Sequence, residues 1–250
     1  MAKICFYLDG EYLKTDATLL DIFTPGRVKY HGAFETMHVT GKTIAYLNEH
    51  LTRLQKGLKV LRIKTKISTA QLKAIANAVV KKNSLKAQGR LRLMVFKESN
   101  QVHCACMIMP YKPYSARIYK EGLKCLIVKT NRKAFSKFAN VKSLDYELFT
   151  NALDAAKQRG HDEAVLLNEK GHVFETSRGN IFIKYQGQWL TPPLSSGCLN
   201  GIMRRRVMDL SQILGIMVKE KNITRHMFKQ SQGMFMSNSL LGLIRIKHHS

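Results

Sequence analysis

Segments with the alternation of β-strands and segments with the three-and-four spacing of amphipathic helices interleave along all 250 residues of the chain. This interleaving is typical of mixed α/β and α+β folds, and the length suits one large or two small domains. Because 45% of the residues are hydrophobic, the chain can bury a sizeable core, and this composition excludes disorder and collagen.

A proline-containing stretch marks the expected domain boundary. Residues 109–114 hold two of the five prolines of the chain and interrupt the apolar pattern. We therefore expect an N-terminal α/β domain at residues 1–109 and a C-terminal domain at residues 110–250.

Local signals predict the elements of both domains. Asp9-Gly10 suits the positive φ angles of a hairpin turn, and Asn48 is a candidate helix N-cap. We expect strands within 3–13 and at 34–39, 43–47, 90–96, 102–109, 122–130, 163–168, 172–175, 180–185 and 188–191, and helices at about 48–61, 69–82, 144–159 and 202–214.

The charge balance is strongly basic. Lys plus Arg is 41 against 17 for Asp plus Glu, a formal net charge of +24, which makes nucleic acid, anionic membranes and phosphorylated ligands candidate partners. The basic residues are spread over the whole length, which favours a generally basic surface over a nucleic-acid-binding arm. No apolar run approaches the roughly 20 residues of a spanning helix, and the N-terminal apolar stretch is too short for a signal peptide. We expect a soluble, cytoplasmic protein.

The five cysteines are odd in number and scattered through apolar stretches, which favours reduced thiols over a disulfide framework. Cys104 and Cys106 share one face of a predicted strand. Core packing explains this pair, whereas a metal site needs further ligands nearby, so we expect no metal centre.

Four ordered segments carry a family resemblance. They are Gly32-Ala33-Phe34-Glu35-Thr36-Met37-His38-Val39 with His50-Leu51-Thr52-Arg53-Leu54; Lys142-Ser143-Leu144-Asp145-Tyr146; 162–167 through Glu175 to Asn180-Ile181-Phe182; and Thr191-Pro192 with Leu199-Asn200-Gly201-Ile202-Met203-Arg204. This set resembles the fold type IV pyridoxal-phosphate enzymes, which include branched-chain and D-amino-acid aminotransferases and aminodeoxychorismate lyases. The resemblance implies a smaller N-terminal α/β sandwich, a C-terminal barrel-like sheet with helices, a small-molecule amino substrate and a homodimer.

The resemblance assigns the cofactor chemistry to two residues. Lys142 matches the lysine that holds the cofactor as a Schiff base and then serves as general base and acid, whereas the alternative is a solvated surface cation. Glu175 matches the carboxylate that keeps the pyridine nitrogen protonated, whereas the alternative is an ordinary strand-end acid.

Further matches concern the phosphate and the cofactor ring. Arg53 matches the family's phosphate arginine, against the alternative of a surface charge on a helix. Residues 201–203, which are Gly201, Ile202 and Met203, fall at a helix start whose N–H groups suit a phosphate. Ser239 stands where a hydroxyl commonly reaches the phosphate. Tyr146 either hydrogen-bonds the cofactor's phenolic oxygen or is a core tyrosine.

The substrate side departs from the family pattern. Asn238, within Met236-Ser237-Asn238-Ser239-Leu240, favours the lyases over the transaminases, and we expect it to face the substrate. The usual Gly-Asp-Gly is replaced by 29–32, which includes Tyr30, and His38 stands where arginine is common. The arginine-rich substrate loop is replaced by a tight turn at 97–100. We expect Lys97, Arg92 or His38 to supply the missing cation, Lys97 first because it ends a strand.

Three functions remain open. The first is a 4-amino-4-deoxychorismate lyase of folate biosynthesis, which releases 4-aminobenzoate and pyruvate. The second is an amino-acid transaminase of the branched-chain or D-amino-acid type. The third is a basic nucleic-acid-binding protein that retains the fold, but no recognised nucleic-acid motif supports it.

Overall fold

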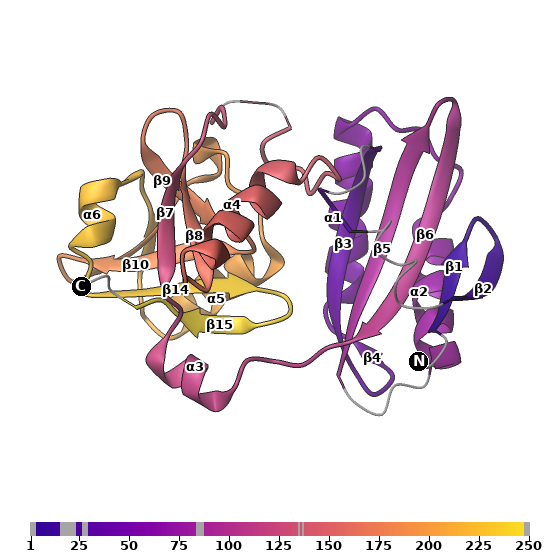
Figure 1. The fold of residues 1–250 in the computed structure, drawn as a ribbon, viewed down its shortest axis with the longest axis horizontal. Coiled ribbons are helices and arrows are strands. Elements are labelled where there is room, and N and C mark those ends of the chain that lie inside the picture. The colour runs from indigo at the N-terminus through magenta and orange to yellow at the C-terminus, as the bar shows by residue number, and fades with distance from the viewer. Residues whose placement is uncertain are drawn as a thin grey trace. The chain divides into compact units, whose positions relative to one another are not determined.

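The computed structural model describes residues 4–15, 24–26, 30–83, 88–134, 136 and 138–247. The chain forms two compact units, of which the first comprises Met1–Pro113 with Val141–Glu147 and the second Tyr114–Asn140 with Leu148–Ser250 (Figure 1). The segment Val141–Glu147, which a single boundary near residue 110 assigned to the C-terminal domain, belongs to the first unit. Its β-bridge from Ser143 to Ala33 of that unit explains this difference.

The described residues of the first unit form a six-stranded sheet with two helices. The sheet order is β2-β1-β6-β5-β3-β4. Its elements are β1 (Ile4–Leu8), β2 (Glu11–Thr15), β3 (His31–Thr40), β4 (Thr43–Ile44), α1 (Leu47–Val60), α2 (Thr69–Asn83), β5 (Gly89–Glu98) and β6 (Gln101–Pro110).

The two faces of this sheet have different cores. Met37 and Val39 of β3 pack with Leu51 and Leu54 of α1 in the main core, so the odd-numbered residues of β3 face the helices. Phe34 lies in a second cluster with Met94 and Phe96, among others, on the opposite face. Because successive side chains of a strand alternate between the faces, β3 and β5 contribute to both cores.

Turn chemistry was well predicted in the first unit, and one helix cap was not. Asp9 and Gly10 have φ angles of 47° and 107°, so the expected hairpin turn between β1 and β2 is confirmed. The prediction of Asn48 as N-cap was wrong, because α1 begins at Leu47 after Tyr46 in a left-handed conformation. Asn48 instead accepts a hydrogen bond from Lys73 Nζ at 3.2 Å.

The second unit contains two sheets, ordered β12-β11-β10-β14-β15 and β13-β9-β8-β7. These sheets are not closed into a barrel among the described residues, which corrects the expected barrel-like sheet. The elements are α3 (Ala116–Glu121), β7 (Cys125–Lys129), α4 (Glu147–Gln158), β8 (Glu163–Leu167), β9 (His172–Thr176), β10 (Asn180–Tyr185), β11 (Gln188–Thr191), α5 (Ile202–Ile213), β12 (Val218–Glu220), β13 (Ile223–Thr224), α6 (Arg225–Lys229), β14 (Gly233–Asn238) and β15 (Gly242–Arg245). A single apolar cluster joins residues of both sheets, including Val165, Ile181 and Met236.

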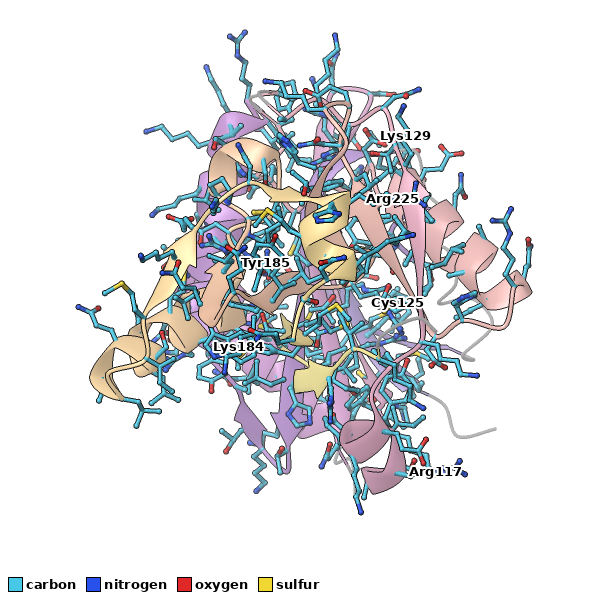
Figure 2. The ribbon with its side chains drawn as sticks, turned by 90° about the vertical axis from the view of Figure 1, so that its left-hand side faces the viewer. Arg117, Cys125, Lys129, Lys184, Tyr185 and Arg225 are labelled. Atoms are coloured by element: carbon cyan, nitrogen blue, oxygen red, sulfur yellow. The ribbon has the colours of Figure 1, made fainter. Side chains whose placement is uncertain are left out.

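Surface charge is dispersed over the second unit. Figure 2 labels basic side chains on four of its elements, α3, β7, β10 and α6: Arg117, Lys129, Lys184 and Arg225. None of the helices in the described part of the chain has the length and apolar character needed to cross a bilayer. All five cysteines are free and buried, and burial raises the pKa of the Cys104 thiol to about 12.

Candidate active site

Lys142 lies along the edge of β3 that β5 does not occupy. The Phe34 amide donates to the Lys142 carbonyl at 3.0 Å, and the Leu144 amide donates to the Gly32 carbonyl at 2.9 Å. Opposite residues of an antiparallel pair share a face of the sheet, so this pairing places Lys142 beside Phe34. The Lys142 Nζ atom lies 4.5 Å from the centroid of the Phe34 ring and 5.3 Å from that of Tyr146.

Phe34 is the centre of this group of side chains. The Tyr146 ring meets it edge-on, with the two centroids 5.4 Å apart, and the Arg92 Cζ atom lies 5.9 Å from the Phe34 centroid. The structure thus brings together three residues proposed from the sequence, Lys142, Tyr146 and Arg92. Phe34 belongs to a quoted motif, but no role was assigned to it.

Two arginines share the Lys142 face of the sheet. Thr36 pairs with Arg92 and His38 with Arg90. Both arginines therefore lie on the face of the sheet that carries the even-numbered residues of β3, which include Phe34. Burial, together with the charge of Arg90 and against an opposing effect of Tyr146, lowers the pKa of Arg92 to about 10. Burial also lowers the pKa of Arg90. Two partly desolvated cations of this kind favour an anionic ligand.

The other expected substrate residues divide between the two faces. His38 Nε2 lies 2.9 Å from Gln88 Oε1, and Tyr30 stacks on Phe96 with centroids 4.8 Å apart; both belong to the Lys142 face. Lys97 is exposed and pairs with His31, so its position falls on the helix-covered face. The geometry therefore favours Arg92 over Lys97 as the cation nearest Lys142.

Arg53 is held by a buried acid that the sequence interpretation did not assign. Its Nε donates to Glu35 Oε1 at 2.8 Å and its Nη2 to Glu35 Oε2 at 2.6 Å. The imidazole of His50 lies with Nδ1 2.6 Å from the same Oε2. Glu35 stands between Ala33 and Met37 on the apolar face of β3, and His50 lies beside Leu51 on the apolar face of α1. Charged and polar residues in such positions require partners, which is the signal that predicts this cluster.

Glu175 lies in the second unit beside the loop that precedes α5. Its Oε2 accepts a hydrogen bond from the Leu199 amide at 3.2 Å. Asn180, the first residue of β10, donates through Nδ2 to the Leu199 carbonyl at 2.7 Å. The buried Glu175 carboxylate therefore lies beside Leu199 in this loop.

The start of α5 has the character of an anion site. Gly201 is the N-cap, no side chain caps the helix and no acid lies in its first turn, so the amides of Ile202 and Met203 are N-terminal donors. A Cβ atom at Gly201 would overlap the side-chain oxygen of Asn180, so a larger residue there would displace Asn180, which donates to the Leu199 carbonyl. Within the second unit, an uncapped helix start suits a phosphate group and the buried Glu175 carboxylate beside it suits a protonated ring nitrogen, which are two features of pyridoxal phosphate.

Asn238 has backbone partners that the sequence interpretation did not assign. Its Oδ1 accepts from the amides of Leu240 at 3.0 Å and Leu241 at 2.7 Å, and its Nδ2 donates to the Arg178 carbonyl at 3.2 Å. The oxygen of the side-chain amide thus binds the turn between β14 and β15, and its nitrogen binds the loop between β9 and β10. Ser239 follows within the same turn. These bonds give Asn238 a structural function that the sequence interpretation missed.

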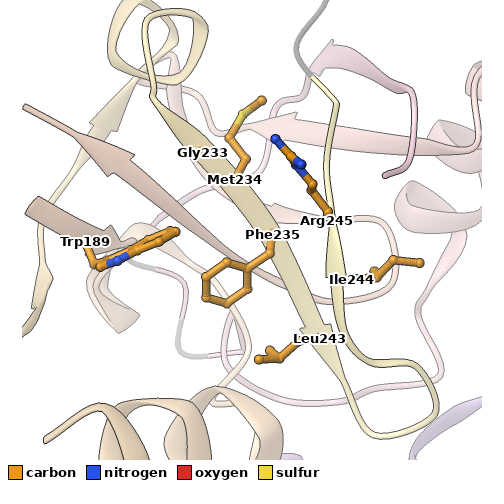
Figure 3. Close-up of a pocket in the computed structure, with 7 residues that line it drawn as sticks. All are labelled: Trp189, Gly233, Met234, Phe235, Leu243, Ile244 and Arg245. Atoms are coloured by element: carbon orange, nitrogen blue, oxygen red, sulfur yellow. The ribbon is translucent and has the colours of Figure 1, made fainter. Parts of the chain in front are cut away.

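A hollow lies on the five-stranded sheet of the second unit. It has a volume of about 360 Å³ and contains none of the residues proposed from the sequence (Figure 3). Its lining is mostly apolar, and consists of Trp189, Gly233, Met234, Phe235, Leu243, Ile244 and Arg245.

Comparison with known proteins gives the family. The amino-transferase class IV family model matches residues 32–248. The chain belongs to the class IV aminotransferases. Enzymes of this family use pyridoxal phosphate and act on small-molecule amino substrates.

The relatives of this class IV chain have more than one activity. An aminodeoxychorismate lyase of Bacillus subtilis is 27% identical over 252 residues, covering 95% of this chain and 84% of the relative. A branched-chain-amino-acid aminotransferase of Escherichia coli is 24% identical over 212 residues, covering 80% and 68%. The solved branched-chain aminotransferase of Thermoproteus uzoniensis with norvaline superposes with a TM-score of 0.85 at 25% identity, covering 99% of this chain and 87% of the other.

Proposed function

We propose that Lys142 binds pyridoxal phosphate covalently, that Glu175 pairs with the ring nitrogen, and that Arg53, the start of α5 and Ser239 bind the phosphate. The support is the ordered motif series together with the geometry of each unit. When bound, this cofactor withdraws electrons from the carbon that bears the substrate's amino group. Tyr146, close to Lys142, is the candidate partner of the cofactor's phenolic oxygen.

A labelling experiment tests this assignment. Borohydride reduction of the loaded protein followed by peptide mass mapping should place a pyridoxyl group on Lys142. The control is Lys97→Ala, which removes an exposed lysine of the same unit and should leave the label in place. A label on another lysine, or none, contradicts the assignment.

We further propose a substrate with more than one carboxylate, and 4-amino-4-deoxychorismate as the leading candidate. The observation that carries this is the partly buried pair Arg90 and Arg92 on the Lys142 face. Two fixed cations can each bind one carboxylate, as a dicarboxylate requires. His38 and Tyr30, on the same face, are further candidate contacts.

Lys142 would move the proton in this reaction. Its amine takes the proton from the carbon that bears the substrate's amino group, and the bond to the enolpyruvyl oxygen breaks as the ring becomes aromatic. The leaving group gains a proton and departs as pyruvate, while 4-aminobenzoate remains. Atoms and electrons balance without an oxidant or an amino acceptor.

A transaminase is the second candidate, of the branched-chain or D-amino-acid type. The same arginine pair suits a dicarboxylate such as glutamate, and the relatives include enzymes named for both activities. The bonds of Asn238 to backbone groups also remove one argument for the lyase. In a transaminase, Lys142 would pass the proton to the cofactor's aldehyde carbon. The amino group would then stay on the cofactor until a keto acid accepts it.

Multiple turnover without a keto acid separates the two. The purified enzyme is mixed with 4-amino-4-deoxychorismate alone, and pyruvate and 4-aminobenzoate are measured against time. A lyase releases both products in equal amounts far beyond one per active site. A transaminase offered glutamate or a branched-chain amino acid alone stops after one turnover and resumes when a keto acid is added.

Three further expectations rest on the family resemblance. We propose a homodimer in the cytoplasm, and, for the lyase, a place in folate biosynthesis. Light scattering on the purified protein tests the dimer. The dispersed basic residues of Figure 2 favour weak, salt-sensitive contact with nucleic acid over a specific nucleic-acid function.

A further inference from the structure

We propose that Glu35 is a positioning residue that fixes the Arg53 guanidinium for the phosphate group, with His50 bracing Glu35 from the other side. This inference rests on the proposed binding of pyridoxal phosphate and goes beyond it, because it concerns residues that do not themselves bind the cofactor.

The first observation is the forked contact between the two side chains. Arg53 uses Nε and Nη2 against the two oxygens of Glu35, at 2.8 and 2.6 Å. Two parallel bonds fix the plane of a guanidinium, which a single bond leaves free to rotate. They occupy one edge of the group and direct its other edge away from Glu35.

Burial separates the roles of these residues. The side chains of Glu35 and His50 are 0% exposed, whereas that of Arg53 is 14% exposed. An incoming anion can therefore reach Arg53 but not the carboxylate behind it. Arg53 is the binding group and Glu35 its support.

His50 completes the support. A carboxylate only accepts hydrogen bonds, so the proton between His50 and Glu35 belongs to Nδ1. Three charged groups face the imidazole: Glu35 from β3, Arg53 from α1, and Lys142 from the segment beside β3. Burial lowers the pKa of His50, and the charges of Arg53 and Lys142 add to this against Glu35, so the ring remains neutral and acts as a fixed donor.

The cluster also keeps Glu35 ionised. Burial raises the pKa of Glu35, but the charge and hydrogen bonds of Arg53 and the hydrogen bond from His50 outweigh burial and lower it to about 2. The forked contact thus persists across the physiological pH range. Glutamine at this position would place an NH2 group where one of the two carboxylate oxygens stands. In either orientation this group faces a donor of Arg53, so one arm of the fork is lost.

Pyridoxal phosphate and pyridoxal, which differ only in the phosphate, provide the test. Their dissociation constants are measured by equilibrium dialysis for the wild type and for Glu35→Gln. We expect Glu35→Gln to raise the dissociation constant of pyridoxal phosphate about tenfold or more, which corresponds to about 1.4 kcal/mol or more. Binding of pyridoxal should change less than twofold.

A double-mutant cycle connects the effect to Arg53. Phosphate discrimination is the ratio of the dissociation constant of pyridoxal to that of pyridoxal phosphate. In an Arg53→Ala background, Glu35→Gln should cause no further loss of this discrimination. Arg53→Lys keeps a cation opposite Glu35, and so remains folded, but cannot form the fork; it should lose about tenfold in discrimination. Glu163→Gln is the matched control, because Glu163 is a buried acid paired with Arg178 at 2.8 Å in the second unit; it should lower stability but leave discrimination unchanged.

Three results would overturn the proposal. They are equal losses for both ligands in Glu35→Gln, full discrimination in Arg53→Lys, and persistence of the Glu35→Gln effect without Arg53. If the wild type binds neither ligand, the proposed function itself fails. If it binds both and the variants discriminate normally, only the positioning role of Glu35 fails.

Discussion

At the scale of single residues, the face of a strand decides which cation can assist Lys142. Arg92 and Lys97 lie five positions apart on β5, so they point to opposite faces of the sheet. Arg92 lies near the Phe34 ring, as does Lys142, while Lys97 is exposed on the other face. Burial and the neighbouring Arg90 make Arg92 a cation that gains from an anionic partner.

Substitution of these two residues should have opposite outcomes. Arg92→Ala should raise the Michaelis constant for a dicarboxylate substrate about tenfold or more, because it removes a charge-assisted contact worth roughly 1.5 to 3 kcal/mol. Lys97→Ala should leave the constant within twofold of the wild type. Steady-state kinetics on both variants measures this, and the reverse pattern would restore Lys97 as the substrate cation.

Glu175 permits a prediction that separates binding from chemistry. Glu175→Gln should retain bound cofactor but lose most of the turnover number, because the amide cannot keep the pyridine nitrogen protonated. The cofactor content follows from absorbance after dialysis, and the turnover from product formation. Undiminished turnover would mean that Glu175 does not act on the ring nitrogen.

At the scale of elements, the turn between β14 and β15 depends on one side chain. Asn238 binds two amides within the turn and the carbonyl of Arg178 in another loop. Gly179, next to Arg178, approaches the Ser237 carbonyl so closely that a Cβ atom would lie 2.5 Å from that oxygen. Asn238 and Gly179 together connect the turn to the start of β10.

Asn238→Ala should therefore lower the free energy of unfolding by about 1 to 3 kcal/mol, because part-buried backbone groups lose their partners. Asn238→Asp keeps the acceptor and loses the donor, so its free energy of unfolding should lie between those of the wild type and Asn238→Ala. Asn77→Ala, at an exposed position of α2, is the control and should cause no loss. Urea denaturation measures all three; a stable Asn238→Ala with altered kinetics would instead support contact with the substrate.

At the scale of the whole molecule, buried titratable groups connect stability to pH. Glu35 has a pKa lowered from 4.5 to about 2, so its contribution is present above pH 4.5 and is lost as the pH falls toward 2. His50 has a pKa lowered from 6.5, so its contribution is present above pH 6.5 and declines below it. Both groups make the folded protein less stable in acid.

The wild type should accordingly lose stability steadily as the pH falls from 6.5 toward 2, and Glu35→Gln should show a shallower dependence below pH 4.5. Urea denaturation at a series of pH values gives the free energy of unfolding for both proteins. Parallel curves in this range would show that Arg53 and His50 do not lower the pKa of Glu35.

The sequence by itself determined the class of fold, the hairpin at Asp9-Gly10, β10 and β11, and the family, because these depend on local periodicity, turn chemistry and ordered motifs. It did not predict the membership of Lys142 in the first unit, since that depends on its pairing with Phe34, 108 residues earlier in the chain. Nor did it predict the roles of Asn238 and Glu35, or that Lys97 lies on the face of the sheet opposite Lys142. Only the tertiary structure decided these, because a side chain's role depends on which distant groups satisfy its hydrogen bonds and charge.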